Sequence, residues 1–122
     1  MSAAAATVVS DDMADVERSL ARGQALVPDH LWDGLRGYIL FGLENGTFLS
    51  AVFANDLLSA ATGADEVSLG RLPDLMRFMH NYAPELCWGS KAVRNSWRRL
   101  GGVEGGACRD AAHEALFERS KA

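Results

Sequence analysis

The sequence lacks most of the features that identify enzymes and metalloproteins. It has no phosphate-loop or dinucleotide glycine pattern. The two cysteines, Cys87 and Cys108, have neither metal nor redox spacing, and His30, His80 and His113 have no carboxylate or cysteine at ligand spacing. A Cys–His nucleophile pair could form between residues distant in sequence, but no pattern supports it. We therefore expect no enzymatic activity, no metal site and no cofactor.

Long apolar runs are also missing. No stretch approaches the roughly 18 apolar residues of a membrane span. The first nine residues contain neither a basic residue nor a full apolar run, which argues against a secretory signal peptide. Only two cysteines, without a disulfide-type pattern, suit a reducing compartment. We expect a soluble protein of the cytoplasm, with no membrane among its partners.

The charge of the chain is unevenly distributed along its 122 residues. Residues 28–86 contain eight acidic and three basic residues (net −5), whereas residues 87–122 contain four acidic and seven basic residues (net +3). The acidic body makes general nucleic-acid binding an unfavoured function. The basic C-terminal third still allows a local anion site. The acidic face of 28–86 is equally compatible with a protein partner.

Apolar spacings of three and four residues predict an all-α protein, a compact bundle of five to six short helices. We divide the chain into an N-terminal helical extension (1–27), a helical core domain (28–102) and a C-terminal helix (103–122). In the extension, Ser10 is the expected N-cap and Gly23 the expected end of the helix. Its apolar seam is narrow, with only Val16 and Leu20 four residues apart. We expect this helix to dock late on the body or on a neighbouring chain.

Start and stop signals also divide the core domain. Pro28 suits the first turn of a helix that ends in the 42–46 turn, and residues 47–60 form one continuous amphipathic helix. Pro73 predicts a short turn followed by a regular helix from about Leu72. Ser90 is the expected N-cap of a helix that Gly101–Gly102 closes. The glycine-rich 101–106 stretch is interpreted as a flexible joint before a final helix from Ala107 to about Glu118.

Asp56 is the least expected residue in the predicted 47–60 helix. At about 100° per residue, its side chain falls in the middle of the apolar stripe. A carboxylate removed from water must be paired, hydrogen bonded or protonated, so we expect Asp56 to meet buried donors. One interpretation is a structural latch to backbone N–H groups or a tryptophan. The other is that Asn55 and Asp56 line a pocket and bind the hydroxyl or amine of a ligand.

A second candidate region begins at Trp88 and contains four basic residues and no acidic residue through position 100. Gly89 would permit close backbone approach, and Ser90 would open a helix whose N–H groups favour an anion. Lys91 and Arg94 would add positive charge, and Trp88 could stack on a flat group. The simpler interpretation is a capped helix with a solvated basic face. A DNA-binding helix-turn-helix is disfavoured because the connection from 83 to 89 is too long.

Several short motifs, taken together, resemble a group of small phage and prophage proteins of unknown function. The pattern is G-x-F-L-x-A-V-x-x-N-D-L from Gly46 to Leu57, then A-D at 64–65, P-x-x-C-W-G-S from Pro84 to Ser90, and W at Trp97. The resemblance covers about residues 28–102. It implies the cytoplasm of a host cell and a common site at Asn55–Asp56 and Trp88–Lys91, but no particular activity.

From these observations we predict a non-enzymatic phage-type accessory protein that counteracts host defence by binding a small anionic, nucleotide-like ligand. The ligand-binding residues would be Asn55, Asp56, Trp88, Gly89, Ser90, Lys91 and Arg94. The alternatives are an inhibitor or adaptor that binds a host protein and, third, a small DNA-binding protein. We also predict a homo-oligomer, because the seam of the first helix is narrow and three tryptophans suggest an adhesive surface.

Overall fold

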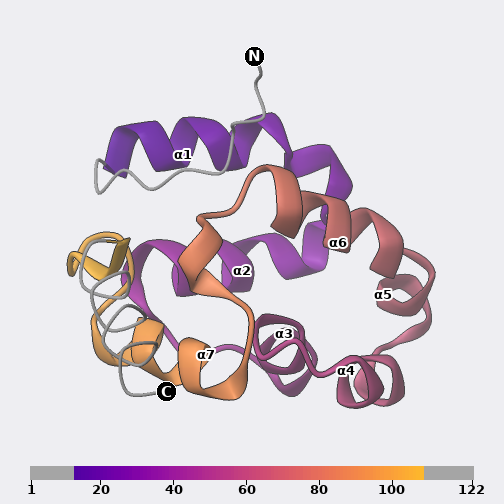
Figure 1. The fold of residues 1–122 in the computed structure, drawn as a ribbon. Helices are drawn as coiled ribbons and strands as arrows, with labels where there is room; N and C mark the ends of the chain where they lie inside the picture. Colours follow the sequence, from indigo (N-terminus) through magenta and orange to yellow (C-terminus); the bar gives the residue numbers. More distant parts are fainter. Residues whose placement is uncertain (1–12, 109–122) are drawn as a thin grey trace.

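A computed structural model describes residues 13–108, and within this range the chain is all-α, which confirms the predicted fold class. The α-helices in chain order are α1 (Met13–Arg22), α2 (Asp29–Phe41), α3 (Thr47–Phe53), α4 (Leu57–Gly63), α5 (Glu66–Gly70), α6 (Leu72–Asn81) and α7 (Lys91–Arg99). Two 3₁₀ helices, η2 (Gln24–Leu26) and η3 (Glu85–Cys87), lie in the connections. Helix α2 lies between α1 on one side and α3 and α7 on the other (Figure 1).

Helix α1 is part of this bundle despite its narrow apolar seam. Val16 and Leu20 are fully buried in the same core as the rest of the chain. The Ser19 hydroxyl donates to the carbonyl of Tyr82 over 2.8 Å, and Glu17 pairs with Arg36 of α2. The helix ends before Gly23, as predicted, whereas its predicted cap at Ser10 lies outside the described residues. The burial of Val16 and Leu20, together with the polar contacts of Ser19 and Glu17, thus holds α1 against its own chain.

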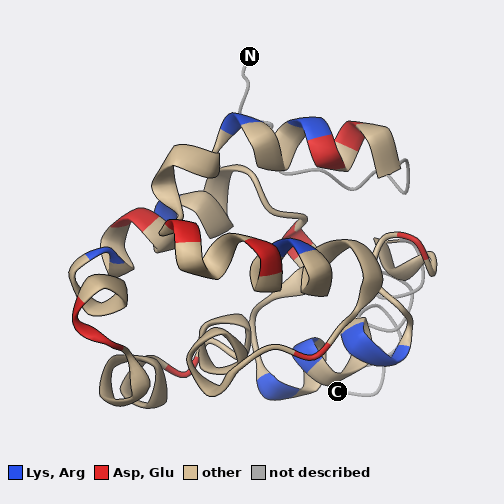
Figure 2. Cartoon of the chain, turned by 180° about the vertical axis from the view of Figure 1, so that it is seen from behind, with Lys and Arg blue, Asp and Glu red and all other residues tan. Residues whose placement is uncertain are grey.

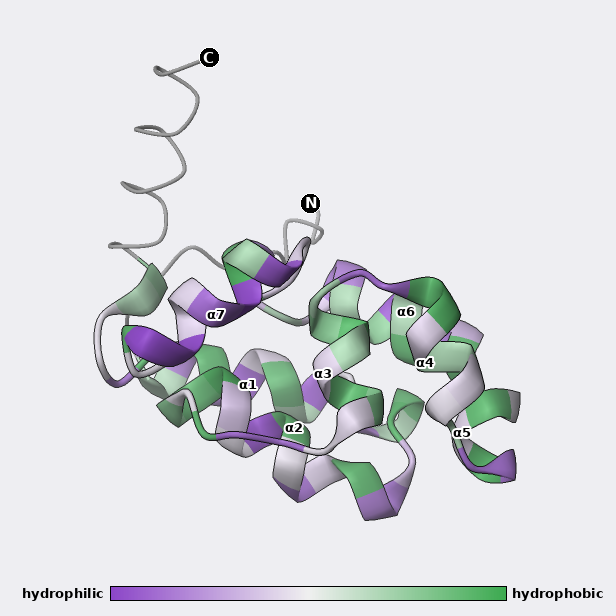
Figure 3. Ribbon diagram, turned by 90° about the horizontal axis from the view of Figure 1, so that it is seen from below, coloured by the Kyte–Doolittle hydropathy of each residue, from purple (hydrophilic) through white to green (hydrophobic). Residues whose placement is uncertain are grey.

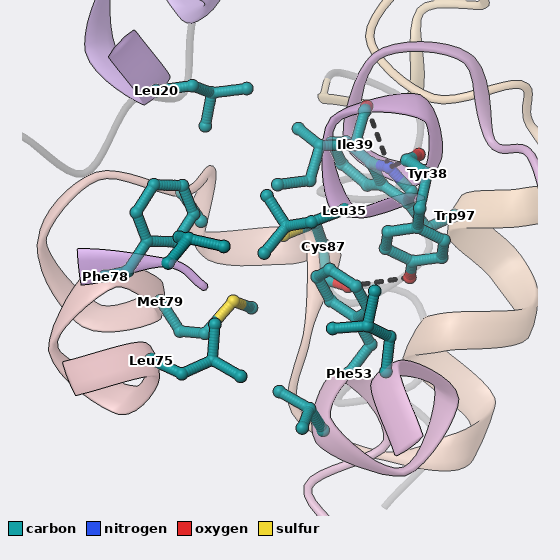
Figure 4. Close-up of a cluster of buried hydrophobic side chains, with 14 of the residues drawn as sticks. Leu20, Leu35, Tyr38, Ile39, Phe53, Leu75, Phe78, Met79, Cys87 and Trp97 are labelled. Atoms are coloured by element: carbon teal, nitrogen blue, oxygen red, sulfur yellow. Dashed lines mark hydrogen bonds between the residues drawn. The ribbon is translucent and has the colours of Figure 1, made fainter. Parts of the chain in front are cut away.

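The centre of the core is a set of aromatic residues from α2, α3 and α7 (Figure 4). The rings of Tyr38 and Phe53 lie 4.0 Å apart between centroids. The Tyr38 hydroxyl donates to the carbonyl of Cys87 over 2.7 Å. Trp97 is fully buried, and its indole N–H is shared between the carbonyls of Tyr38 (3.2 Å) and Ile39 (3.1 Å). These bonds satisfy the polar atoms of both aromatic side chains inside an apolar environment.

Neither cysteine forms a disulfide, and both are buried in this core. Burial, with a further contribution from neighbouring Cys108, raises the pKa of the Cys87 thiol well above its usual value. The same desolvation raises the pKa of the Tyr38 hydroxyl. Both groups are therefore held in their neutral forms.

Most of the predicted helix boundaries are confirmed. Pro28 precedes the first residue of α2, and Gly42 ends that helix in the left-handed conformation at φ 70°. Helix α6 begins at Leu72 with Pro73 in its first turn, after the short α5. Ser90 caps α7 by accepting the Val93 N–H over 3.1 Å. These boundaries follow from local chemistry, which the sequence carries directly.

The prediction of one continuous helix over 47–60 is wrong. The structure has two helices, α3 and α4, separated by Ala54–Asp56. Asn55 takes a positive φ of 57°, and the Asp56 N–H donates back to the Ala51 carbonyl over 2.9 Å. Asparagine tolerates this left-handed conformation better than most residues, and it ends a helix in the way glycine does. The apolar periodicity persists across the break, which is why periodicity alone missed it.

The 101–106 stretch is a docked turn and not the flexible joint we expected. Val103 N–H donates to the Ile39 carbonyl over 3.1 Å, and Glu104 N–H donates to the Leu40 carbonyl over 2.8 Å. Gly102 has φ 66°, and a Cβ there would lie 2.6 Å from the backbone nitrogens of Phe41 and Gly42. Glycine is needed here because two backbones touch. Of the predicted final helix, Ala107 and Cys108 are helical and buried, and the rest lies outside the described residues.

Candidate functional site

Asp56 is exposed, so the prediction of a buried carboxylate is wrong. It is the N-cap of α4, and its Oδ1 accepts the Ser59 N–H over 3.1 Å. Hydrogen bonds from the Ser59 side chain and backbone lower the pKa of Asp56. The break at Asn55 turns the chain, so the position that would face the core of a continuous helix faces solvent instead. The latch interpretation is met only in part: Asp56 accepts a backbone N–H of the following helix, that of Ser59, but both residues are exposed.

A shallow hollow lies beside Asn55 and Asp56. Its volume is about 30 Å³, and its lining comes from α3, the α3–α4 turn, α4 and α6: Ala51, Val52, Asn55, Asp56, Leu57, Ala60, Leu72 and Met76. Pockets for small molecules typically enclose about 300–1,000 Å³. The hollow therefore accepts the tip of one side chain and is too small for a nucleotide.

The second half of the predicted site lies next to this region but outside the hollow. The Gly89 N–H donates to the Phe53 carbonyl at the end of α3 over 3.0 Å, so Trp88–Ser90 runs beside that helix end. Gly89 has φ 143°, a conformation that other residues rarely adopt. None of Trp88, Gly89, Ser90, Lys91 and Arg94 lines the hollow. The structure thus brings the two motifs together at their backbones without forming one shared cavity.

The start of α7 has the features that anion binding requires. Ser90 caps the helix, and Lys91 is exposed in its first turn with no ion pair among the described residues. The indole nitrogen of Trp88 and Nε of Arg94 are buried donors without a hydrogen-bond partner in residues 13–108. Arg94 also reaches Asn95 Oδ1 over 2.7 Å. Donors and positive charge are therefore present here, outside the hollow beside Asp56.

The basic residues of α7 and the acidic residues that flank α4 lie at different ends of the molecule, whereas α1, α2 and α6 carry both signs (Figure 2). The blue residues of α7 lie at one end, and red segments lead into α4 and from α4 into α5 at the other. Residues 47–70 contain three carboxylates, Asp56, Asp65 and Glu66, and neither lysine nor arginine. The charge difference between the 47–70 segment and α7 seen in the sequence thus also separates two parts of the molecule in space.

Sequence reasoning missed a group of exposed apolar residues on the acidic end. Helices α4 and α5 are 7 and 5 residues long, and only Ala60 and Ser68 in them are buried. We name the exposed apolar residues of α4, α5 and α6 the open surface: Leu57 (67% exposed), Leu58 (76%), Val67 (58%), Leu69 (49%) and Met76 (38%). Figure 3 shows the hydrophobic colouring of α4 and α5. The sequence signal was the Asn–Asp pair, which marks a helix end and a new start, and thus places Leu57 and Leu58 outside the apolar stripe.

A His–Asp–Ser cluster links α2 to α5 but lacks the geometry of a catalytic triad. His30 Nε2 lies 3.0 Å from Asp65 Oδ2 and 3.1 Å from Ser68 Oγ. In a triad the acid and the serine contact different ring nitrogens, whereas here both contact Nε2. Asp65 also caps α5 by accepting the Ser68 N–H over 2.7 Å, and the Ser68 backbone and hydroxyl, with a smaller effect of His30, lower the pKa of Asp65. The cluster joins the start of α2 to the start of α5 through hydrogen bonds.

Residues 13–108 support neither a metal site nor a DNA-binding helix-turn-helix. No group of three histidine, cysteine or acidic side chains in this range is arranged to hold a metal ion. Residues 82–90, which include η3, separate α6 from α7 and exceed the three- or four-residue turn of a helix-turn-helix.

None of the described helices has both the length and the apolar character that a membrane crossing requires.

No family model matches the chain, and neither a curated protein nor a solved structure is similar to it. The resemblance to small phage proteins therefore stays a prediction from the sequence pattern. What can be argued about function comes from the open surface, the hollow and the start of α7.

Proposed function

We propose that this chain is a non-enzymatic binding protein that acts by docking another protein on its open surface. The observation that carries the proposal is the exposure of five large apolar side chains on three consecutive helices, α4, α5 and α6. Exposed apolar groups on a small protein mark interaction sites, because water disfavours them unless a partner covers them. Two of the five, Leu57 and Met76, line the same hollow. This choice places the protein-binding alternative ahead of the nucleotide-like ligand.

In the phage setting that the sequence pattern implies, the partner would be a host protein in the host cytoplasm. Binding would inhibit that protein or recruit it, and so counteract host defence. The 30 Å³ hollow supports a protein over a small molecule, because it can seat one side chain of a larger partner but cannot enclose a free ligand.

A crosslinking experiment in cells tests this proposal. A photo-crosslinking amino acid is placed at position 58, in the open surface, or at position 43, where Leu43 is also exposed but lies in the α2–α3 connection. We expect a discrete adduct from position 58, identified by mass spectrometry, and its loss when Leu57→Ser is added. The purified partner should then bind the chain directly. Equal adducts at 43 and 58, or none at 58, would reject the proposal.

A second candidate function, binding of a small anion at the start of α7, is favoured by one specific observation. The exposed Lys91, the helix start capped by Ser90 and the unpartnered buried donors of Trp88 and Arg94 all belong to residues 88–94. A thermal-shift screen of nucleotides and inorganic phosphate provides the test, since a ligand at 100 times its Kd stabilises by about 2.7 kcal/mol. Lys91→Glu with Arg94→Glu should abolish any such shift and leave helical content intact. A shift that survives the double change would exclude this site.

Self-association stays a prediction, but the narrow seam of α1 and the three tryptophans no longer support it as they did. Helix α1 is anchored on its own chain, and Trp97 is fully buried. The remaining ground for a homo-oligomer is the open surface. Light scattering at high micromolar concentration tests it, and a monomer would leave this surface free for a different partner.

A further inference from the structure

We propose that the partner segment docked on the open surface is a cationic amphipathic helix. This inference rests on the proposed function and names its partner class. It follows from one juxtaposition, in which an apolar hollow flanked by Leu57 and Met76 lies on an end of the molecule that carries carboxylates and no lysine or arginine over residues 47–70.

The hollow specifies the anchor of this partner. Its floor consists of small or buried apolar residues, such as Ala51, Val52 and Ala60, and the exposed Leu57 and Met76 also line it. An aliphatic side chain entering it would lose its water contacts and cover both exposed residues. Neighbouring apolar groups of the partner, one helical turn away, would then lie over the remaining apolar side chains of α4 and α5.

The partner is a helix because the open surface has no strand edge that could hydrogen bond to the backbone of an extended peptide. Extended peptides bind by adding a strand to a sheet edge, and residues 13–108 contain no strand. A helix satisfies its own backbone hydrogen bonds and presents apolar anchors at spacings of three and four residues. The open surface provides side-chain contacts only, and these suit a helix.

The partner is cationic because of the carboxylates around this surface. Asp56 lines the hollow itself, Asp65 is the N-cap of α5, and Glu66 is the first residue of that helix. Arg71, the N-cap of α6, and Arg77 within α6 both pair with Asp74 over 3.0 Å, so this ion-pair group keeps one net positive charge against the three carboxylates of residues 47–70. Complementary charge around an apolar centre guides association and selects among partners.

The same charges argue against other occupants. A second copy docked symmetrically through this surface would bring the carboxylates of both copies into one interface. Like charges brought together in this way disfavour the complex. An anionic lipid surface would be repelled for the same reason. A positively charged partner is the occupant that these residues favour.

The test uses the full chain and labelled peptides of about 18 residues, roughly five helical turns. One peptide has a leucine stripe and lysine elsewhere, the second replaces every lysine by glutamate, and the third scrambles the first so that no stripe remains. Fluorescence anisotropy measures Kd. We expect the leucine–lysine peptide to bind at least about tenfold more tightly than either control, with affinity falling as salt rises.

Matched variants of the chain locate the binding. Leu57→Ser with Met76→Ser should weaken the leucine–lysine peptide by about tenfold or more, because both line the hollow. Asp56→Asn, Asp65→Asn and Glu66→Gln together should weaken it by about tenfold, since each exposed charge contributes a few-fold, and asparagine still caps a helix. Leu43→Ser is the control and should change nothing. Circular dichroism confirms that each variant is folded.

The outcomes separate this inference from the proposed function. Equal binding of the lysine and glutamate peptides overturns the cationic partner, as does lysine-peptide binding that survives Leu57→Ser with Met76→Ser. Absence of peptide binding, self-association through this surface, or binding to anionic vesicles but not to the peptide also overturns it. The crosslinking at position 58 does not depend on the charge of the partner, so the proposed function stands or fails on that measurement.

Discussion

The two ends of this small bundle use their apolar residues in opposite ways. At the packed end, around Tyr38, Phe53 and Trp97, five of the seven residues of α3 are buried. At the open end, formed by α4 and α5, one residue of each helix is buried. Both ends contain leucine, valine and alanine, but the helices of the open end contain no aromatic residue. The difference shows that one end supplies the stability of the fold, which leaves the other free to serve a partner.

The largest expected effect comes from the packed end. Trp97→Ala should cost about 3–5 kcal/mol of unfolding free energy, because it leaves a cavity and removes the donor shared by two buried carbonyls. Leu58→Ala at the open end should change it by less than about 0.5 kcal/mol, since that side chain is exposed. Urea denaturation followed by circular dichroism measures both. Similar losses in the two variants would contradict the division into two ends.

The contact between two backbones at Gly102 gives the next effect. Gly102→Ala should destabilise by about 3 kcal/mol, because a Cβ at φ 66° meets the nitrogens of Phe41 and Gly42. Gly63→Ala is the matched control, with no atom within 4 Å of the added Cβ. It should be neutral or stabilise by about 0.5 kcal/mol. The same denaturation series applies, and a neutral Gly102→Ala would indicate that the 101–106 turn is loose after all.

The buried hydroxyl of Tyr38 refines the comparison within the packed end. Tyr38→Phe should cost about 1–2 kcal/mol, because the carbonyl of Cys87 loses its donor in an apolar setting. Tyr82→Phe is the control, since its ring is half-buried and no hydrogen bond of its hydroxyl is found in the described residues. It should change stability by less than about 0.5 kcal/mol. Thermal unfolding of the two variants at pH 7 separates the contributions of ring and hydroxyl.

The smallest effect concerns the capping carboxylates of the open end. The folded-state pKa values of Asp56 and Asp65 are lowered, so their contribution is complete above the unfolded pKa of about 4 and is lost as pH falls through the folded pKa. Unfolding at pH 7 and pH 3 should show this loss. Asp56→Asn, which caps without titrating, should lose less on acidification than the natural chain. An identical loss would mean that the Asp56 cap does not contribute.

The packed end was largely predictable from the sequence, and the open end was not. Gly42, Pro73 and Ser90 act through their own backbone chemistry, so the elements they bound could be recognised in isolation. The α3–α4 break depended on Asn55 adopting a left-handed conformation inside a segment whose apolar period continues. Whether residues 47–60 form one helix or two is decided by tertiary contacts, which the sequence pattern does not contain. That one turn moved Asp56 from the expected core to solvent and left Leu57 and Leu58 uncovered.

The candidate site divides in the same way. The cap at Ser90 was predicted correctly because a serine before a basic helix is a local signal. The common site of Asn55–Asp56 and Trp88–Arg94 was predicted from polar residue types and from the resemblance, and neither carries information about volume. A hydrogen bond from the Gly89 N–H to the Phe53 carbonyl brings the two segments side by side. The prediction that the segments are neighbours was therefore correct, but the hollow is lined by only one of them.

The two buried thiols also make the molecule its own reporter of opening motions. Cys87 and Cys108 are 0% and 3% exposed, so a thiol-reactive dye reaches them only when the surrounding helices separate. The labelling rate of the natural chain therefore measures how often the packed end opens, and a single engineered cysteine at position 58 would label at once. A partner bound at the open end should slow the labelling of a cysteine at position 58. It should leave the labelling rates of Cys87 and Cys108 unchanged.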